Sequence, residues 1–248
     1  MKKSLKKILF TILTVFAVFF VVACGNKEDA KINKEEVLKK NVETTNNIKS
    51  GNKLVTAKVE IEGGQTIEYI FDISLIKDPF ALKTILGAKG EDAKITTFIK
   101  DGMMYVTSTE DDTWEQQAIP EETIEGYKNI LNDSIEIYEV LKDNLDKISI
   151  KEDGGNYIIS AAKNSDFLNE YLKSSLSDTI GQNTDLKPNN ATLEYIIDKE
   201  TYFTKSLVLT FDAEVQGQKL KAKTETTFSN INSVGEITVP EEALNSNN

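Results

Sequence analysis

The stretch Lys53-Leu-Val-Thr-Ala-Lys-Val-Glu-Ile61, followed by Gly63-Gly64 and then by Ile67-Glu-Tyr-Ile-Phe-Asp-Ile-Ser-Leu75, decides the fold of this chain. In both runs an apolar side chain stands at every second position, which is the period of a β-strand that buries one face. A pair of glycines between two such runs favours a tight reversal of the chain. The sequence therefore predicts an antiparallel β-hairpin at 53–75.

The rest of the chain combines further strands with a few helices. Strands are expected at 80–86, 94–100, 103–109, 113–119, 147–151 and 156–161, and near 193–197, 203–211 and 220–228. Amphipathic helices are expected at 33–48, 120–131, 133–145 and 165–179, the first with Asn33 as N-cap and the third with Asp133 and Glu136 as a capping box. So few helices cannot cover both faces of so large a sheet. The sequence therefore predicts an α+β fold, in which a large curved antiparallel β-sheet carries the helices on its concave face.

The first residues have the pattern of a bacterial export signal. Four lysines precede an apolar stretch at 8–23, which is shorter than the roughly 20 residues that a membrane-spanning helix needs. The stretch ends in Val21-Val22-Ala23-Cys24, which resembles the lipobox of bacterial lipoproteins. We expect cleavage before Cys24 and a covalent diacylglycerol and acyl lipid on this residue. The alternative is a simple secretory signal with an incidental cysteine.

These observations predict the organisation of the chain. Residues 1–23 are expected to be a cleaved signal peptide, 24–32 the lipidated cysteine and a short tether, 33–240 a single domain and 241–248 a flexible tail. The folded part would then be held at the extracytoplasmic face of the cell membrane by its lipid anchor. The oligomeric state is left open, with a monomer as the expectation.

The composition excludes several classes of function. The chain has a net charge of −11, and loss of the four lysines in the signal would lower it to −15, which argues against a nucleic-acid partner. There is no histidine, Cys24 is the only cysteine, and all 29 basic residues are lysines. These absences remove Ser-His-Asp catalysis, His- or Cys-rich metal sites and bidentate arginine clamps for phosphate. We therefore expect a protein that is not an enzyme and has no metal and no cofactor other than the covalent lipid.

Two catalytic designs remain open on composition alone. A pair of carboxylates of the glycosidase kind and a Ser-Lys pair need neither histidine nor cysteine. In a chain with 40 acids and 29 lysines such pairs arise by chance, and the sequence shows no motif that selects one of them. The acidic turns also lack the ligand spacing of an EF-hand calcium loop.

A cavity between the sheet and the helices would be lined by the apolar rows of the strands. The candidate ligand-binding residues are Val59, Ile61, Tyr69, Phe71, Ile73, Leu207, Leu209 and Phe211. The alternative is a filled core in which these side chains pack together, because every half-buried sheet has such rows.

Two further stretches resemble a known family. They are Asp78-Pro79-Phe80-Ala81-Leu82-Lys83 and Ile99-Lys100-Asp101-Gly102-Met103-Met104-Tyr105, the second followed by Asp112-Thr113-Trp114. This pattern resembles the uncharacterised lipoproteins of low-GC Gram-positive bacteria, which are similar in architecture to the lipoprotein carrier LolA and to mycobacterial lipid-carrying lipoproteins. The resemblance implies an open half-barrel whose helices cover an apolar cavity. In this chain Trp114 is followed by Glu115, where a basic residue is expected.

The leading hypothesis is a surface lipoprotein that binds or carries a hydrophobic ligand, such as a lipid or an acyl chain. The alternative is a non-catalytic interaction or structural module that presents a surface to an envelope or host partner. The first predicts bound lipid in a cavity, whereas the second predicts no cavity and an apolar or aromatic surface patch. A carboxylate-based hydrolase is a third, weaker hypothesis.

Overall fold

The computed structural model describes residues 32–64, 66–109, 113–163, 165–180, 187–215 and 217–246, with the side chains of 175–180 and 215 left out. They belong to one compact unit that begins at Ile32. The strands are β1 (Ser50–Ile61), β2 (Thr66–Lys77), β3 (Phe80–Ala88), β4 (Lys94–Lys100), β5 (Met103–Ser108), β6 (Trp114–Ala118), β7 (Ile148–Asp153), β8 (Asn156–Ala161), β9 (Asn189–Asp198), β10 (Thr204–Val215) and β11 (Gln218–Ser229). The helices are α2 (Lys34–Asn46), α3 (Glu121–Tyr127), α4 (Asp133–Leu141), the short 3₁₀ helix η2 (Lys142–Asn144), α5 (Asp166–Ile180) and α6 (Glu241–Leu244).

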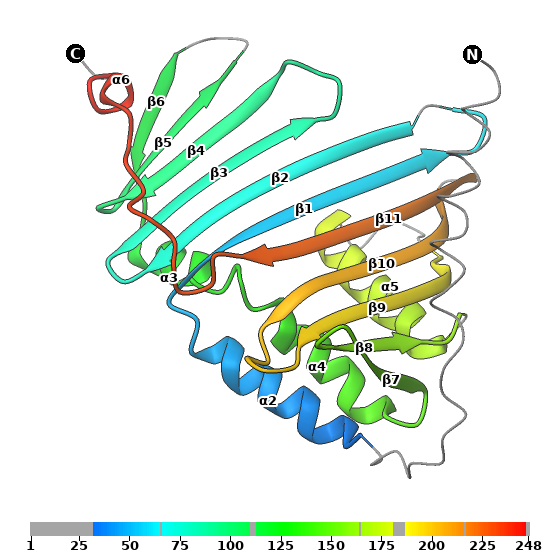
Figure 1. The fold of residues 1–248 in the computed structure, drawn as a ribbon. Coiled ribbons are helices and arrows are strands. Elements are labelled where there is room, and N and C mark those ends of the chain that lie inside the picture. The colour runs from blue at the N-terminus through cyan, green and yellow to red at the C-terminus, as the bar shows by residue number, and fades with distance from the viewer. Residues whose placement is uncertain are drawn as a thin grey trace, which may run out of the picture. The chain divides into compact units, whose positions relative to one another are not determined.

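All eleven strands join in one antiparallel sheet with the order β6-β5-β4-β3-β2-β1-β11-β10-β9-β8-β7. Figure 1 shows the first strand, β1, lying between β2 and the last strand, β11. The sheet therefore consists of two meanders, β1–β6 and β7–β11, that meet at the β1–β11 pair. It is open, because its edge strands β6 and β7 do not pair with each other. The prediction of a large antiparallel sheet with few helices is confirmed.

The hairpin predicted from the alternating stretch is formed by β1 and β2. Val59 pairs with Ile67 and Val55 pairs with Phe71, so the apolar rows of the two strands lie on the same face. Gly63 in the connecting turn has a φ of 71°, a backbone conformation that favours glycine. The predicted strand at 94–100 has the bounds of β4, and the other predicted strands differ from the observed ones mainly at their ends.

One face of the sheet, here called the helix face, carries most of the core. Under α2, α4 and α5, side chains of β8–β10 such as Ile159, Tyr195 and Ile197 are buried. A second cluster joins Ile73 and Leu75 of β2 to the turn after α3. We call the other side of the sheet the opposite face. The prediction that the helix face is concave stays a prediction.

A buried polar cluster holds α2 and α4 on β9 and β10. The Tyr195 hydroxyl donates to Oδ1 of Asn41 (2.5 Å) and lies 2.9 Å from Oγ1 of Thr204. Nδ2 of Asn41 donates to the Tyr202 carbonyl (2.8 Å) and to Thr204 (3.0 Å), and the Ser134 hydroxyl also contacts Thr204. Because each of these polar groups has a partner inside the protein, the cluster avoids the cost of burying free polar atoms.

The two predicted helix starts have different outcomes. Asn33 caps α2 as expected, since its side chain accepts from the Glu36 amide (3.2 Å). The capping box predicted for α4 is wrong, because Asn132 is the N-cap and makes no side-chain capping bond. Asp133 instead pairs with Lys53 of β1. A tertiary ion pair therefore replaces the local bond.

The C-terminal segment packs on the opposite face over β3–β6 from Val234 onward, whereas Ile231 before it packs against the second cluster of the helix face. Ile237, Val239 and Ala243 are buried there against a cluster that includes Phe98, and Nζ of Lys100 donates to the Ile237 carbonyl (3.0 Å). The stretch 241–246 was expected to belong to a flexible tail. It contains helix α6, and the contacts of Ala243 with the opposite face are the physical reason for the difference.

Asp198 at the end of β9 should make stability depend on pH in the acid range. Its carboxylate pairs with Nζ of Lys205 (2.7 Å) and accepts from the Thr201 amide (2.9 Å). The ion pair first, and then the hydrogen bond, lower the pKa of Asp198 below its ordinary value. The folded state therefore binds this proton less readily than the unfolded state, so the stabilisation is full above the ordinary pKa of about 3.9 and is lost as pH falls.

We expect Asp198→Asn to lower the urea midpoint at pH 7 and to reduce the difference between the midpoints at pH 7 and pH 3. Asp72→Asn, at an exposed position on the opposite face, is the control and should leave that difference unchanged. Equal pH profiles of Asp198→Asn and the parent protein would contradict this account.

Candidate functional site

The helix face carries exposed apolar side chains in its part formed by β1–β4, where none of the helices in the described ranges covers them. Tyr69 and Ile95 are each 46% exposed and Leu86 is 40% exposed. Next to them, Val59, Ile61, Ile67 and Phe71 are half-buried. We define the apolar surface as Val59, Ile61, Ile67, Tyr69, Phe71, Leu86 and Ile95.

The strand register makes this surface continuous. Leu86 of β3 lies directly opposite both Phe71 of β2 and Ile95 of β4. Tyr69 is two residues from Phe71 on the same face, so its ring lies diagonally beside Leu86. Neighbouring strands lie about 4.7–4.9 Å apart, so the four strands span roughly 14 Å. Contiguous exposed apolar patches of this kind mark binding sites more often than chance exposure of single residues.

The predicted ligand-binding residues divide into two groups. Val59, Ile61, Tyr69 and Phe71 come together in the apolar surface, as the strand alternation indicated. Of the other four, Ile73, Leu207 and Phe211 are buried and Leu209 is half-buried. Ile73 lies in the cluster under β2, Leu207 and Phe211 lie in the cluster under the helices, and Leu209 packs against the latter. For the three buried residues the filled-core interpretation describes the structure.

Leu86 and Ile95 were not among the predicted residues, although they are central to the surface. Both lie inside strands that the sequence predicts, at 80–86 and 94–100. Their phase in those strands was a usable signal, because Leu86 is four residues from Leu82 and so lies on the same face of β3, and Leu82 lies opposite the buried Leu75. What was missing was the register between strands.

One ion pair lies on the helix face, on the same side of β1 as the apolar surface. Nζ of Lys53 donates to both carboxylate oxygens of Asp133 (2.8 and 2.7 Å) and to the Ile130 carbonyl (3.0 Å). The side chains are only 12% and 24% exposed. All three donors of the ammonium group are thus engaged, and this lysine offers no free positive charge to a ligand.

The concavities described in the structure lie elsewhere. They have volumes of about 310 to 510 Å³, and none of the five is lined by Tyr69, Leu86 or Ile95. The two that lie along β10, β11 and β1 share Glu60, Asp212 and Lys221 as lining residues. Ile61 is the one residue of the apolar surface that lines any of these five pockets, and the rest of the surface is an open face.

The described residues contain no group of three or more Cys, Asp or Glu side chains placed to hold a metal ion. None of the helices in the described ranges has the length and apolar character to span a bilayer. Cys24 and the predicted signal peptide lie outside the described residues, so lipidation of Cys24 stays a prediction.

Comparison with known proteins gives one family and several distant structural similarities. Residues 33–248 match the model of a family described as a family of unknown function, DUF6612. No curated protein matched the chain. Among solved structures, the lipoprotein LppX of Mycobacterium tuberculosis is similar at 10% identity and a TM-score of 0.44, over 82% of this chain and 97% of that one.

Two other solved structures are similar over comparable lengths. A DUF1329 family protein from Desulfovibrio piger aligns at 10% identity and a TM-score of 0.27, over 84% of this chain and 95% of its own. A LolA superfamily protein from Nitrosomonas europaea aligns at 7% identity and a TM-score of 0.24, with the same coverage of 84% and 95%.

Proposed function

The chain belongs to the DUF6612 family, whose function is unknown, and we propose that it binds or carries a hydrophobic ligand, such as a lipid or an acyl chain, on its apolar surface. The observation that supports this function is the exposure of Tyr69, Leu86 and Ile95 on neighbouring strands of one sheet face. Leaving apolar area in water costs about 25 cal/mol per Å², so a ligand that covers these side chains gains that free energy. The protein acts by binding and not by catalysis in this proposal.

The proposed location is the extracytoplasmic face of the membrane, with the lipid on Cys24 as anchor. The lipobox-like Val21-Val22-Ala23-Cys24 supports the anchor, and the short tether at 24–32 would hold the apolar surface close to the membrane. A ligand with an acyl chain would then be available within reach of the protein. The predicted origin in a low-GC Gram-positive bacterium stays a prediction.

Native mass spectrometry of residues 25–248, purified from a bacterial host, tests the binding function. We expect an adduct with the mass of a lipid that disappears after organic extraction. A clean unliganded mass, together with no uptake of added fatty acid or phospholipid, would contradict the proposal.

A pair of variants tests the surface itself. Leu86→Thr combined with Ile95→Thr should lower lipid occupancy about tenfold or more, because each change removes on the order of 1 kcal/mol of apolar contact. Leu54→Thr is the matched control, since Leu54 is 41% exposed on the opposite face. Equal loss of lipid in both variants would place the ligand elsewhere.

A protein partner is the second candidate function, and the openness of the apolar surface favours it. None of the five concavities is lined by Tyr69, Leu86 or Ile95, and a flat apolar face also suits a protein interface. In that case the protein would carry no lipid, and a partner captured on the purified chain would be lost with Leu86→Thr and retained with Leu54→Thr.

A further inference from the structure

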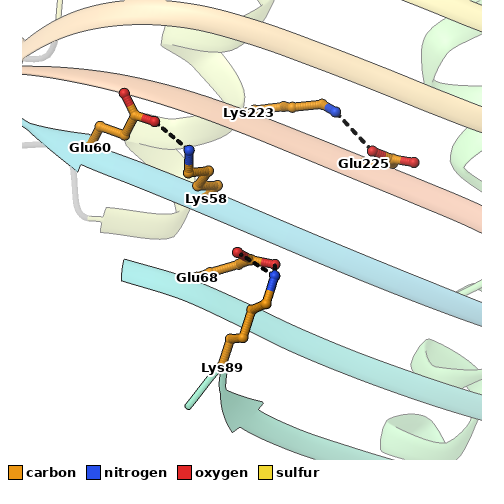
Figure 2. A network of polar contacts seen from close by, with 6 residues as sticks. All are labelled: Lys58, Glu60, Glu68, Lys89, Lys223 and Glu225. Atoms are coloured by element: carbon orange, nitrogen blue, oxygen red, sulfur yellow. Dashed lines mark hydrogen bonds and ion pairs between the residues drawn. The ribbon is translucent and has the colours of Figure 1, made fainter. Parts of the chain in front are cut away.

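Two lysines on the opposite face of the sheet stand directly across from each other. Lys58 of β1 pairs in register with Lys223 of β11. Like charges in this position repel and destabilise a strand pair. Each ammonium group is turned away to a carboxylate two residues further along its own strand, Lys58 to Glu60 and Lys223 to Glu225 (2.9 Å). Since the strands are antiparallel, the two ammonium groups diverge, as Figure 2 shows.

The space beside this lysine pair is a groove of about 420 Å³. Four lysines line it, together with the hydroxyls of two threonines on β9 and β10 that contact each other. Its charged and hydroxyl-bearing lining residues are Lys58, Lys163, Lys221, Lys223, Glu60, Asp212, Thr192 and Thr210. The lining residues carry four ammonium groups and two carboxylates, and two further carboxylates stand beside them: Glu225, which pairs with Lys223, and Glu68, which lies across from Lys58 on β2.

The carboxylates do not neutralise all of these lysines. Asp212 accepts from Nδ2 of Asn190 (2.7 Å), and Glu60 is paired with Lys58. Within the part of the chain that the structure describes, Lys163 and Lys221 make no ion pair. The ammonium group of Lys163 therefore remains available to a ligand, whereas Lys221 lies in register between the carboxylates of Glu60 and Asp212. Exposed pairs such as Lys58 with Glu60 are weak enough to exchange for a better acceptor.

The wall of the groove formed by β9 and β10 has an irregular register. The pairing shifts between Thr210 and Asp212, and Asn190 on the facing strand has a φ of 55°. Such β-bulges redirect side chains and are frequent at binding sites. Here the bulge brings the Asn190 amide onto Asp212, which holds this carboxylate beside Lys221, its partner in the register of β10 and β11.

We propose that this groove, at the Lys58–Lys223 pair, binds the phosphate groups of an anionic ligand. A phosphate has several acceptor oxygens, so a single group can bridge ammonium groups on neighbouring strands and also accept from a threonine hydroxyl. Lysine is a common phosphate ligand that acts as a point charge, and it is the only basic residue type in the chain. Binding would replace the repulsion between Lys58 and Lys223 by a shared counter-charge.

This site is independent of the proposed hydrophobic-ligand surface. Lys58 and Val59 are neighbours in β1 and point to opposite faces of the sheet. A phosphate could come from a phosphodiester polymer of the envelope, from a lipid headgroup or from free phosphate. The recognition chemistry is the same for all three sources, and the probes below distinguish them.

The test is a titration of the full chain at low salt with three probes: inorganic phosphate, an oligomer of glycerol phosphate, and vesicles of phosphatidylglycerol measured against vesicles of phosphatidylcholine. We expect at least one probe to bind and its affinity to fall at high salt. Preference for the oligomer indicates a polymer, preference for phosphatidylglycerol indicates a headgroup, and binding of inorganic phosphate alone indicates the free ion. Each of these results supports phosphate recognition.

The double variant Lys58→Gln and Lys223→Gln should weaken binding of that probe about tenfold or more. The charge-matched control is Lys49→Gln with Lys89→Gln, two exposed lysines outside the groove, and its affinity should stay within about twofold of the parent protein. Side chains that are 42% and 50% exposed can be replaced without unfolding the sheet, which circular dichroism would verify. Failure of all three probes to bind, or equal losses in the two double variants, would overturn the proposal.

Discussion

Replacing Asn41 with Ala should lower the free energy of unfolding by about 3–4 kcal/mol, because two buried and one partly buried hydrogen bond are lost and their partners stay inside the protein. The side chain accepts from Tyr195 and donates to Thr204 and to the Tyr202 carbonyl. Tyr195 is 1% exposed, so water cannot easily replace the missing partner. Urea unfolding followed by circular dichroism measures the change.

Asn47→Ala is the control for this experiment. Asn47 follows the same helix, and its side chain makes one exposed bond, to the Glu43 carbonyl (2.8 Å). Its replacement should cost about 0.5 kcal/mol or less. If Asn41→Ala cost no more than this, the buried polar cluster would not be what holds α2 on the sheet.

The same cluster should limit stability at high pH. Burial raises the pKa of Tyr195 to about 12. The folded state therefore retains this proton more strongly than the unfolded state, whose tyrosines titrate near the ordinary value of about 10. The contribution is full below that value and is lost as pH rises toward the pKa of the folded state.

Replacing Asp133 with Ala should destabilise the protein by about 2–4 kcal/mol, since it leaves the Lys53 ammonium group largely buried without its counter-charge. Replacing both partners, with Lys53→Met and Asp133→Leu, should cost much less, because an apolar pair needs no compensation. Thermal or urea unfolding of the two variants gives this comparison directly.

The matched control is the exposed pair of Glu139 and Lys142 on α4 and η2. Glu139 is 58% exposed, and Glu139→Ala should change the free energy of unfolding by about 0.5 kcal/mol or less. A double variant of Lys53 and Asp133 that is as unstable as Asp133→Ala would show that packing, and not the unpaired charge, causes the loss.

The elements of the sheet could be predicted from the sequence because the residue pattern that specifies each strand lies within that strand. The alternation at Val55–Ile61 and at Ile67–Leu75 is sufficient to specify two strands and the face that each one buries. The pairing of β1 with β11 is not local. The sequence of neither strand identifies the other as its partner, since many apolar rows in this chain could pair in the same way.

The candidate site was predictable to the same extent. Alternation places Tyr69, Ile73 and Leu207 on buried faces, but it does not say which of them a helix will cover. That depends on where α2, α4 and α5 lie, and their placement rests on contacts such as Asn41 with Thr204. For the same reason Asp133 was assigned a capping role, because its tertiary partner Lys53 lies far away in the sequence.

The meeting of β1 and β11 at the middle of the sheet has a consequence for biosynthesis. The meander β1–β6 can form early, but the edge of β1 stays unpaired until the end of the chain has been made. A long-range strand pair of this kind closes slowly, because the chain must lose the entropy of a very large loop first. A nascent or truncated chain that lacks β11 would present a twelve-residue strand edge to its neighbours, so chaperone protection during this interval would matter more than for a sheet built from local hairpins alone.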